Sequence, residues 1–211
     1  MQPAPKNTPW FTRPADLWSV LAVSGIVVVW NLIFLVRGLI PLLGGGEVDV
    51  TVLLSGAQVP LPLGQGGSPV EAGVPSAQVA VSDLGAFMTV WAVGAVVVVP
   101  LATITVTLLV AGLSRNFLRG QFFSPRNTWI ITAISLVVAV AWALNLMCTR
   151  FTSNWALVQI GGDQGFRTWS QDTIISGPHA WLPIFAAMAI GALAAVFRAG
   201  ERMQRDTEGL V

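Results

Sequence analysis

The chain has 211 residues and a formal net charge of +1, with 54% hydrophobic and only 10% charged residues. A water-soluble domain carries about 25% charged residues, so most of this surface faces lipid, and the small net charge provides no field that attracts nucleic acid. One cysteine and one histidine exclude an intrachain disulfide, a cysteine-based zinc or iron–sulfur cage and a bis-histidine haem.

Four apolar runs predict four membrane-spanning helices, because each is close to or above the roughly 20 residues that a span needs. They cover 17–43, 84–113, 129–148 and 180–197. The expected fold is an all-α transmembrane four-helix bundle that forms a single integral membrane domain over 1–211. Its connecting parts are outer segments at 44–83 and 149–178, a cytoplasmic loop at 114–128 and a cytoplasmic tail at 198–211.

The basic residues predict the orientation of the helices. If the N-terminus lies inside, all lysines and arginines lie inside except Arg37, Arg150 and Arg167. Cytoplasmic segments carry an excess of lysine and arginine, so we expect both termini in the cytoplasm. The predicted location is a bacterial inner membrane, with the lipid bilayer as the first partner and no nucleic-acid partner.

The two outer segments differ from the helices in their pattern. EVDVTVLL (47–54) and AQVAVSD (77–83) alternate apolar and polar residues, which is typical of half-buried strands. AQVPLPL (57–63) could return as an edge strand, since its prolines exclude a central position. In the second segment, WALVQI and FRTWSQDTI flank a Gly-Gly-Asp turn at 161–163. These patterns predict a small extracytoplasmic β-rich cap, with pairing between the two loops favoured over separate hairpins.

Few residues have catalytic or metal-binding potential. His179 lacks convergent ligands at a defined spacing, so a hydrogen-bonded interfacial histidine is the favoured interpretation, and its role and that of Cys148 stay open. The middle of each span lacks ionisable groups, which argues against a transport pathway. No phosphate-binding loop, nucleophile elbow or zinc-protease motif is present. We therefore expect no enzyme, no catalytic residue, no metal and no cofactor.

Some positions inside the spans suit helix packing. Asn31 is a neutral amide of the kind that bonds between helices, and Ala187, Gly191 and Ala195 follow a small-xxx-small spacing that lets backbones approach closely. These residues could pack within the bundle or form a face for another membrane protein. Packing within the bundle is the favoured alternative.

Two basic, aromatic stretches resemble motifs of one family. GQFFSPRN (120–127) resembles a G-x-P-F-[ST]-x-x-N segment, and AVFRAGERMQRDTEGLV (195–211) resembles the ending E-V-F-R-x-G-x-x-L-x-x-[ED]-x-[ED]-x-L-V. Both of these motifs are those of the bacterial four-span membrane proteins catalogued as domain of unknown function 2975. The matching positions are Gly120, Phe123, Ser124, Asn127, Phe197, Arg198, Gly200, Leu210 and Val211. The resemblance implies a four-span fold, but no reaction and no cofactor.

The same loop also contains a helix start. Ser124-Pro125 has the residues of an N-cap followed by a first helical position. The family's basic residues after the asparagine are missing here, and Gln121-Phe122 stands where the family often has an acidic residue and proline. These two differences distinguish the cytoplasmic loop of this chain from that of the family.

The sequence leads to three hypotheses of function. The first is a non-enzymatic accessory or structural subunit that packs against a larger membrane complex, such as a respiratory or cell-envelope assembly. The alternative is a membrane sensor or regulator that signals through its arginine-rich loop and tail. The third is a small transporter.

Overall fold

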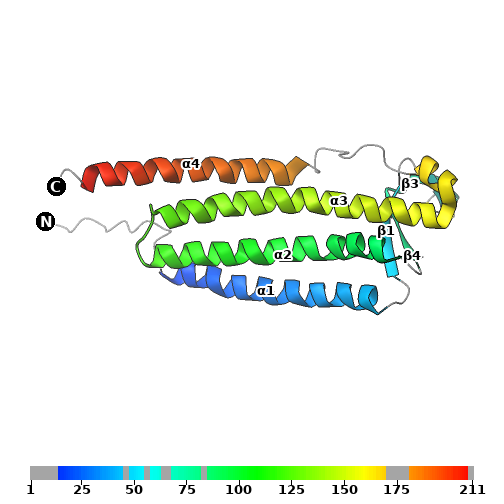
Figure 1. Cartoon of the computed structure of the whole chain (residues 1–211), viewed down its shortest axis with the longest axis horizontal. Helices are drawn as coiled ribbons and strands as arrows, with labels where there is room; N and C mark the ends of the chain where they lie inside the picture. The colour runs from blue at the N-terminus through cyan, green and yellow to red at the C-terminus, as the bar shows by residue number, and fades with distance from the viewer. Residues whose placement is uncertain are drawn as a thin grey trace. The chain divides into compact units, whose positions relative to one another are not determined.

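The structure is a computed structural model that describes residues 14–44, 48–54, 58–62, 68–81, 85–169 and 181–208. Its helices are α1 (Pro14–Leu43), α2 (Gly85–Leu118), α3 (Pro125–Trp169) and α4 (Leu182–Glu208), and its strands are β1 (Val48–Leu53), β2 (Gln58–Leu61), β3 (Val70–Gly73) and β4 (Ser76–Val81) (Figure 1). The described chain is therefore mostly helical, with its strands confined to the region between α1 and α2.

Within these ranges, four helices are long and apolar enough to cross a membrane: Trp18–Leu43, Gly85–Leu118, Pro125–Gly162 and Leu182–Met203. They carry large apolar side chains on their surfaces, such as Ile26 and Phe87, both 69% exposed. Such surfaces are stable in lipid but not in water. The helices are compatible with the predicted four-span bundle.

The chain folds as two compact units, which are described separately below. Unit 1 comprises Met1–Leu32, Leu101–Ala139 and Pro183–Val211, and unit 2 comprises Ile33–Pro100 and Val140–Leu182. Unit 1 therefore contains the loop between α2 and α3, and unit 2 contains the strands.

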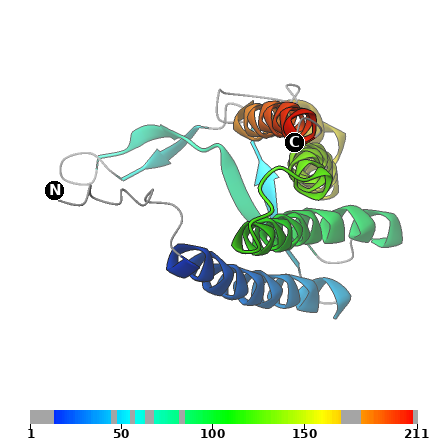
Figure 2. The ribbon, with the colours of Figure 1, turned by 90° about the vertical axis from the view of Figure 1, so that its left-hand side faces the viewer.

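The strands of unit 2 form two short antiparallel ladders. β1 pairs with β4 from Val48↔Val81 to Leu53↔Ser76, and β2 pairs with β3 from Gln58↔Gly73 to Leu61↔Val70. A bond from the Leu54 amide to the Pro75 carbonyl, at 3.0 Å, extends the first ladder toward the second. Figure 2 shows the resulting ribbon, with β2 and β3 beyond β1 and β4. Strands form within 47–54, 57–63 and 77–83 as expected, over their described residues. β2 does not return on β1, however, but pairs with β3, which was not predicted.

The core of unit 2 lies where β1 packs on the helices. Val48, Val50 and Val52 are buried while Asp49 and Thr51 between them are exposed, so the predicted alternation is confirmed. The three valines share a hydrophobic cluster with residues from α1, α2, α3 and β4: Leu42, Ala92, Ala156, Leu157 and Val81. A strand with one apolar face needs such a cover, because an isolated two-stranded ribbon is marginally stable.

The prediction that the second outer segment supplies strands was wrong for 149–169. That stretch continues α3, which runs from Pro125 to Trp169, so the described strands pair within the first outer segment and not between the two. In this part of α3 the buried residues Cys148, Thr152 and Ala156 recur every fourth position on one helical face. A short apolar run such as WALVQI does not distinguish the two periods by itself. The glycine pair marks a kink, not a hairpin, because Gly162 has φ 59° and ψ −156°.

The helices also extend beyond the predicted spans near the α2–α3 loop. α2 continues to Leu118 and α3 begins at Pro125, so only 119–124 of the predicted loop 114–128 lies between helices. α4 continues to Glu208, where an ion pair at 2.6 Å between Arg205 and Glu201 supports the last turns. Pairs four residues apart on a helix face each other, so much of the predicted tail is helical.

Packing between α2 and α3 in unit 2 yields the first testable prediction. A Cβ atom placed on Gly94 would lie 2.6 Å from the Cys148 Sγ, whereas one on Gly112, also in α2, would meet nothing within 4 Å. We expect Gly94→Ala to lower the thermal midpoint in mild detergent by about 2–4 °C for each kcal/mol of overpacking strain. Gly112→Ala is the matched control and should leave the midpoint unchanged or raise it.

Cys148→Ala removes the clashing sulfur atom, so the Gly94→Ala/Cys148→Ala pair should recover part of the loss. If Gly94→Ala melts at the same temperature as Gly112→Ala, this close packing of α2 and α3 does not exist.

Candidate functional site

The α2–α3 loop in unit 1 is a tight turn with defined hydrogen bonds. After α2 ends at Leu118, the amide of Gly120 bonds to the Phe117 carbonyl at 2.9 Å, and the amide of Gln121 bonds to the Asn116 carbonyl at 3.1 Å. Gly120 has φ 74°, a left-handed conformation that glycine adopts without steric cost and that commonly ends helices. The glycine of the family-like motif therefore reverses the chain.

The next helix begins as predicted. Ser124 lies just before α3, its Oγ accepts the amide of Asn127 at 3.3 Å, and its carbonyl accepts the amide of Thr128 at 3.1 Å. Pro125 is the first helical residue, a position where the missing N–H costs nothing. The predicted N-cap of Ser124 with Pro125 after it is confirmed.

A buried amide pair holds this loop in place. The side chain of Asn127 is 0% exposed and that of Asn116 is 4% exposed. The Asn127 Nδ2 donates to the carbonyls of Gln121 at 2.6 Å and Phe122 at 3.0 Å, and its Oδ1 accepts from the Asn116 Nδ2 at 2.7 Å. Both Nδ2 donors of Asn127 are therefore satisfied, which buried polar groups require.

Aromatic rings connect this loop to α4. Phe117 stacks on Phe122 at 5.4 Å and on Phe197 at 6.4 Å between ring centroids, and Phe123 lies 5.5 Å from Phe197. These separations are within the range of favourable ring pairs. A Cβ on Gly200 would lie 2.6 Å from the Phe123 Cδ1, so only glycine admits the Phe123 ring at this place.

We call this group the loop–tail cluster. It consists of Asn116, Phe117, Gly120, Gln121, Phe122, Phe123, Ser124, Asn127, Phe197 and Gly200. It unites six of the nine positions that match the family motifs, from segments about 70 positions apart. The seventh, Arg198, is exposed next to Phe197, and Leu210 and Val211 lie outside the described residues. Sequence reasoning missed Asn116 and Phe117, although both stand in the same basic, aromatic stretch.

The elements that form the loop–tail cluster also carry exposed positive charge. Arg115 and Arg119 lie at the end of α2, Arg126 at the start of α3, and Arg198 and Arg202 on α4, all with exposed side chains. Within the described part of the chain, no group of three His, Cys, Asp or Glu residues is placed to hold a metal ion. The exposed guanidinium groups of these arginines can bind an anionic group.

The residues predicted for helix packing lie in different environments. In unit 1, the Ser135 Oγ donates to the Ala187 carbonyl at 2.7 Å and lies 3.3 Å from a Cβ placed on Gly191, so this face of α4 packs against α3. Ala195 is exposed and its neighbour Ala194 is buried instead. The Asn31 Nδ2 donates to the Val27 carbonyl of its own helix at 2.8 Å.

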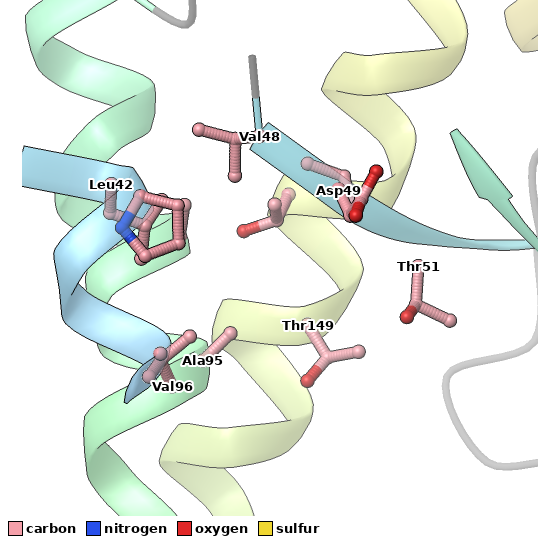
Figure 3. A pocket seen from close by; sticks show the side chains of 12 residues that line it. Leu42, Val48, Asp49, Thr51, Ala95, Val96 and Thr149 are labelled. Carbon is pink, nitrogen blue, oxygen red and sulfur yellow. The ribbon is translucent and has the colours of Figure 1, made fainter. Parts of the chain in front are cut away.

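Unit 2 contains a cavity of about 390 Å³ beneath β1. In Figure 3, Leu42 of α1 and Ala95 and Val96 of α2 lie on one side, and Asp49 of β1 and Thr149 of α3 on the other. Most of the exposed lining is apolar. The sequence did not indicate this cavity, because its walls come from four separate elements.

The two remaining residues singled out from the sequence are His179 and Cys148. His179 lies outside the described residues. Cys148 is a buried free cysteine that faces Gly94.

Four helices able to span a membrane, joined by a short amide-locked turn and a strand ribbon, define the class of multi-pass membrane protein. Comparison with protein-family models, with curated proteins and with solved structures found no match to this chain. The resemblance to domain of unknown function 2975 therefore stays a prediction.

The amide pair yields the second testable prediction. Asn127→Ala removes the partner of two loop carbonyls and of the Asn116 side chain, and the buried Asn116 amide alone costs about 1–3 kcal/mol when unsatisfied. We expect the thermal midpoint to fall by at least about 5 °C and protease cleavage to appear within 119–124. Gln121→Ala, which removes an exposed side chain, is the control and should do neither. Equal melting of the two variants would show that the amide pair does not hold the loop.

Proposed function

We propose that this protein is a non-enzymatic accessory subunit of a larger membrane protein complex. The single observation that carries the proposal is a groove in unit 1 between α1 and α2, of about 320 Å³. It is lined almost entirely by apolar surface and by short or β-branched side chains: Ser19, Val20, Val23, Ser24, Val27, Val106, Thr107 and Val110. Helix association in lipid depends on close packing at small residues, so this groove suits a helix of another subunit.

The content of the spans supports a structural role. Asp and Glu are missing from the described segments Trp18–Leu43, Gly85–Leu118 and Pro125–Gly162. Glu201, near the end of α4, is paired with Arg205. Proton and ion pathways usually need acidic groups at membrane depth, so a small transporter is the weakest of the three hypotheses.

The proposed setting is the inner membrane of a bacterium with both termini in the cytoplasm. The basic residues around the α2–α3 loop and on α4 support this orientation through the positive-inside rule. In this orientation the loop–tail cluster lies inside and the β ribbon outside. The resemblance to the four-span family of domain 2975 belongs to the same proposal.

The third prediction tests the groove. Thr107→Phe fills it, so we expect a stoichiometric partner recovered from native membranes with the wild-type chain to be lost, as measured by affinity purification and mass spectrometry. Leu108→Phe changes the adjacent position, which is 58% exposed and not part of the groove, and should retain the partner. A wild-type chain that purifies without any partner would contradict the proposal. So would loss of the partner in both variants at unchanged thermal midpoints.

The second candidate function is a membrane regulator, and one observation favours it. The loop and α4 form one packed cluster through Phe123, Phe197 and Gly200. A ligand on either segment would therefore affect the other. The exposed arginines beside the cluster would supply the contact to an acidic partner.

The fourth prediction tests this candidate. Replacing Arg115, Arg119 and Arg126 together by Gln should abolish co-purification of a water-soluble partner and leave the thermal midpoint within about 1 °C, because these side chains are exposed. Arg205→Gln, at an exposed arginine that is already paired with Glu201, is the control. Retention of the soluble partner by the triple variant would remove the regulator hypothesis and leave the accessory subunit.

A further inference from the structure

The cavity beneath β1 has the size and surface of a small-molecule site. Its volume of about 390 Å³ lies within the range of roughly 300–1,000 Å³ typical of ligand pockets. Small side chains of α2 leave the space open: Ala92 and Ala95. An apolar group of a few carbon atoms would fill this part of the cavity and displace water from it.

Three of the four polar side chains of the lining are gathered on one side of the cavity, and the fourth, Thr152, donates to the Cys148 carbonyl at 2.8 Å. Figure 3 shows Asp49 and Thr51 of β1 on the same side as Thr149 of α3, opposite Leu42. Asp49 is the ionisable residue of the lining, and it is exposed to solvent. Within the described part of the chain, the ion pair found joins Arg205 and Glu201, so Asp49 has no cationic partner there. This side of the cavity therefore carries one carboxylate and two hydroxyl groups.

This combination selects among ligand classes. An anion would be repelled by the carboxylate, and one carboxylate is too few ligands for a calcium ion, which takes about 6–8 oxygen atoms. A neutral apolar molecule would leave the carboxylate unused. An ammonium group carries a positive charge and several N–H donors, which match one carboxylate and the oxygen atoms of hydroxyl groups.

We propose that the cavity between β1 and the ends of α1, α2 and α3 binds a small amphiphilic amine. Its ammonium group lies at Asp49, on the side of Thr51 and Thr149, and its apolar part lies beside Ala92, Ala95 and Val96. The occupant is a primary ammonium attached to a short apolar body. The headgroup of phosphatidylethanolamine and a free alkylamine share this chemistry.

The fifth prediction uses hexylammonium as the probe on the full chain in mild non-ionic detergent. A ligand that binds the folded state raises the thermal midpoint in proportion to its occupancy. We expect hexylammonium to raise the midpoint, and hexanoate, which has a six-carbon chain and the opposite charge, to have no effect at the same concentration. Equal effects of the two compounds would overturn the proposal.

Two variants test the charge of Asp49 and the volume of the cavity separately. Asp49→Asn should weaken hexylammonium binding roughly fivefold, the size expected for an exposed ion pair, and Glu71→Gln, at an exposed acidic residue of β3 outside the cavity, should not change it. Ala95→Leu fills the cavity and should abolish binding. If Asp49→Asn does not fold, Thr149→Val tests the same end of the cavity and should weaken binding two- to threefold. Binding equal to wild type in Asp49→Asn, or in Ala95→Leu, would overturn the proposal.

The source of the amine is distinguished by adding lipid. A lipid headgroup is the ligand if phosphatidylethanolamine reduces hexylammonium binding by the wild-type chain and phosphatidylglycerol does not. In that case phosphatidylethanolamine should leave the residual binding by Asp49→Asn unchanged. If phosphatidylethanolamine has no effect while the Asp49 dependence holds, the ligand is a soluble amine.

Discussion

Close approach of backbone to neighbouring side chains at glycine is the constraint on which the helix packing depends. A Cβ would lie 2.5 Å from the Val96 Cγ1 at Gly38, 2.6 Å from the Cys148 Sγ at Gly94, and 2.6 Å from the Phe123 ring at Gly200. At Gly191 it would lie 3.3 Å from the Ser135 Oγ. These four glycines lie between α1 and α2, between α2 and α3, between the loop and α4, and between α3 and α4. In lipid, apolar burial does not drive helices together, so close packing and a few polar bonds must do so.

Several polar side chains of the described spans bond within their own helix, and one bonds to a neighbouring helix. Ser24 and Asn31 donate to carbonyls of their own helix, and Ser135 donates across to α4. The amide pair of Asn116 and Asn127 is the densest of these groups, because it satisfies two loop carbonyls as well as itself. A turn between two spans has carbonyls that find no hydrogen-bond donor within the helices. Asn127, in the first turn of α3, donates to two of them.

The loop–tail cluster, which supports the regulator candidate, and the cavity beneath β1 differ in their chemistry, and the groove that supports the subunit role is separate from both. The loop–tail cluster is closely packed and surrounded by exposed arginines, which suits contact with a macromolecule. The cavity beneath β1 is apolar with one carboxylate, which suits a small cation. The proposed subunit role and the proposed amine site rest on different residues, so each can fail without the other. A complex that assembles around a bound amphiphile would connect them.

The residues determined much of this protein without any structure. Apolar run length predicts the four helices, because a helix in lipid satisfies its backbone internally. The alternation at Val48, Val50 and Val52 predicts a strand, and Ser124-Pro125 predicts where α3 begins. Only the tertiary structure decided that 149–169 is helical, because its short apolar run fits both periods until the neighbours that bury Thr152 and Ala156 are known. It also decided that Asn116, Asn127 and Gly200 meet in one cluster and that Asp49 borders a cavity, since those relations join residues distant in the chain.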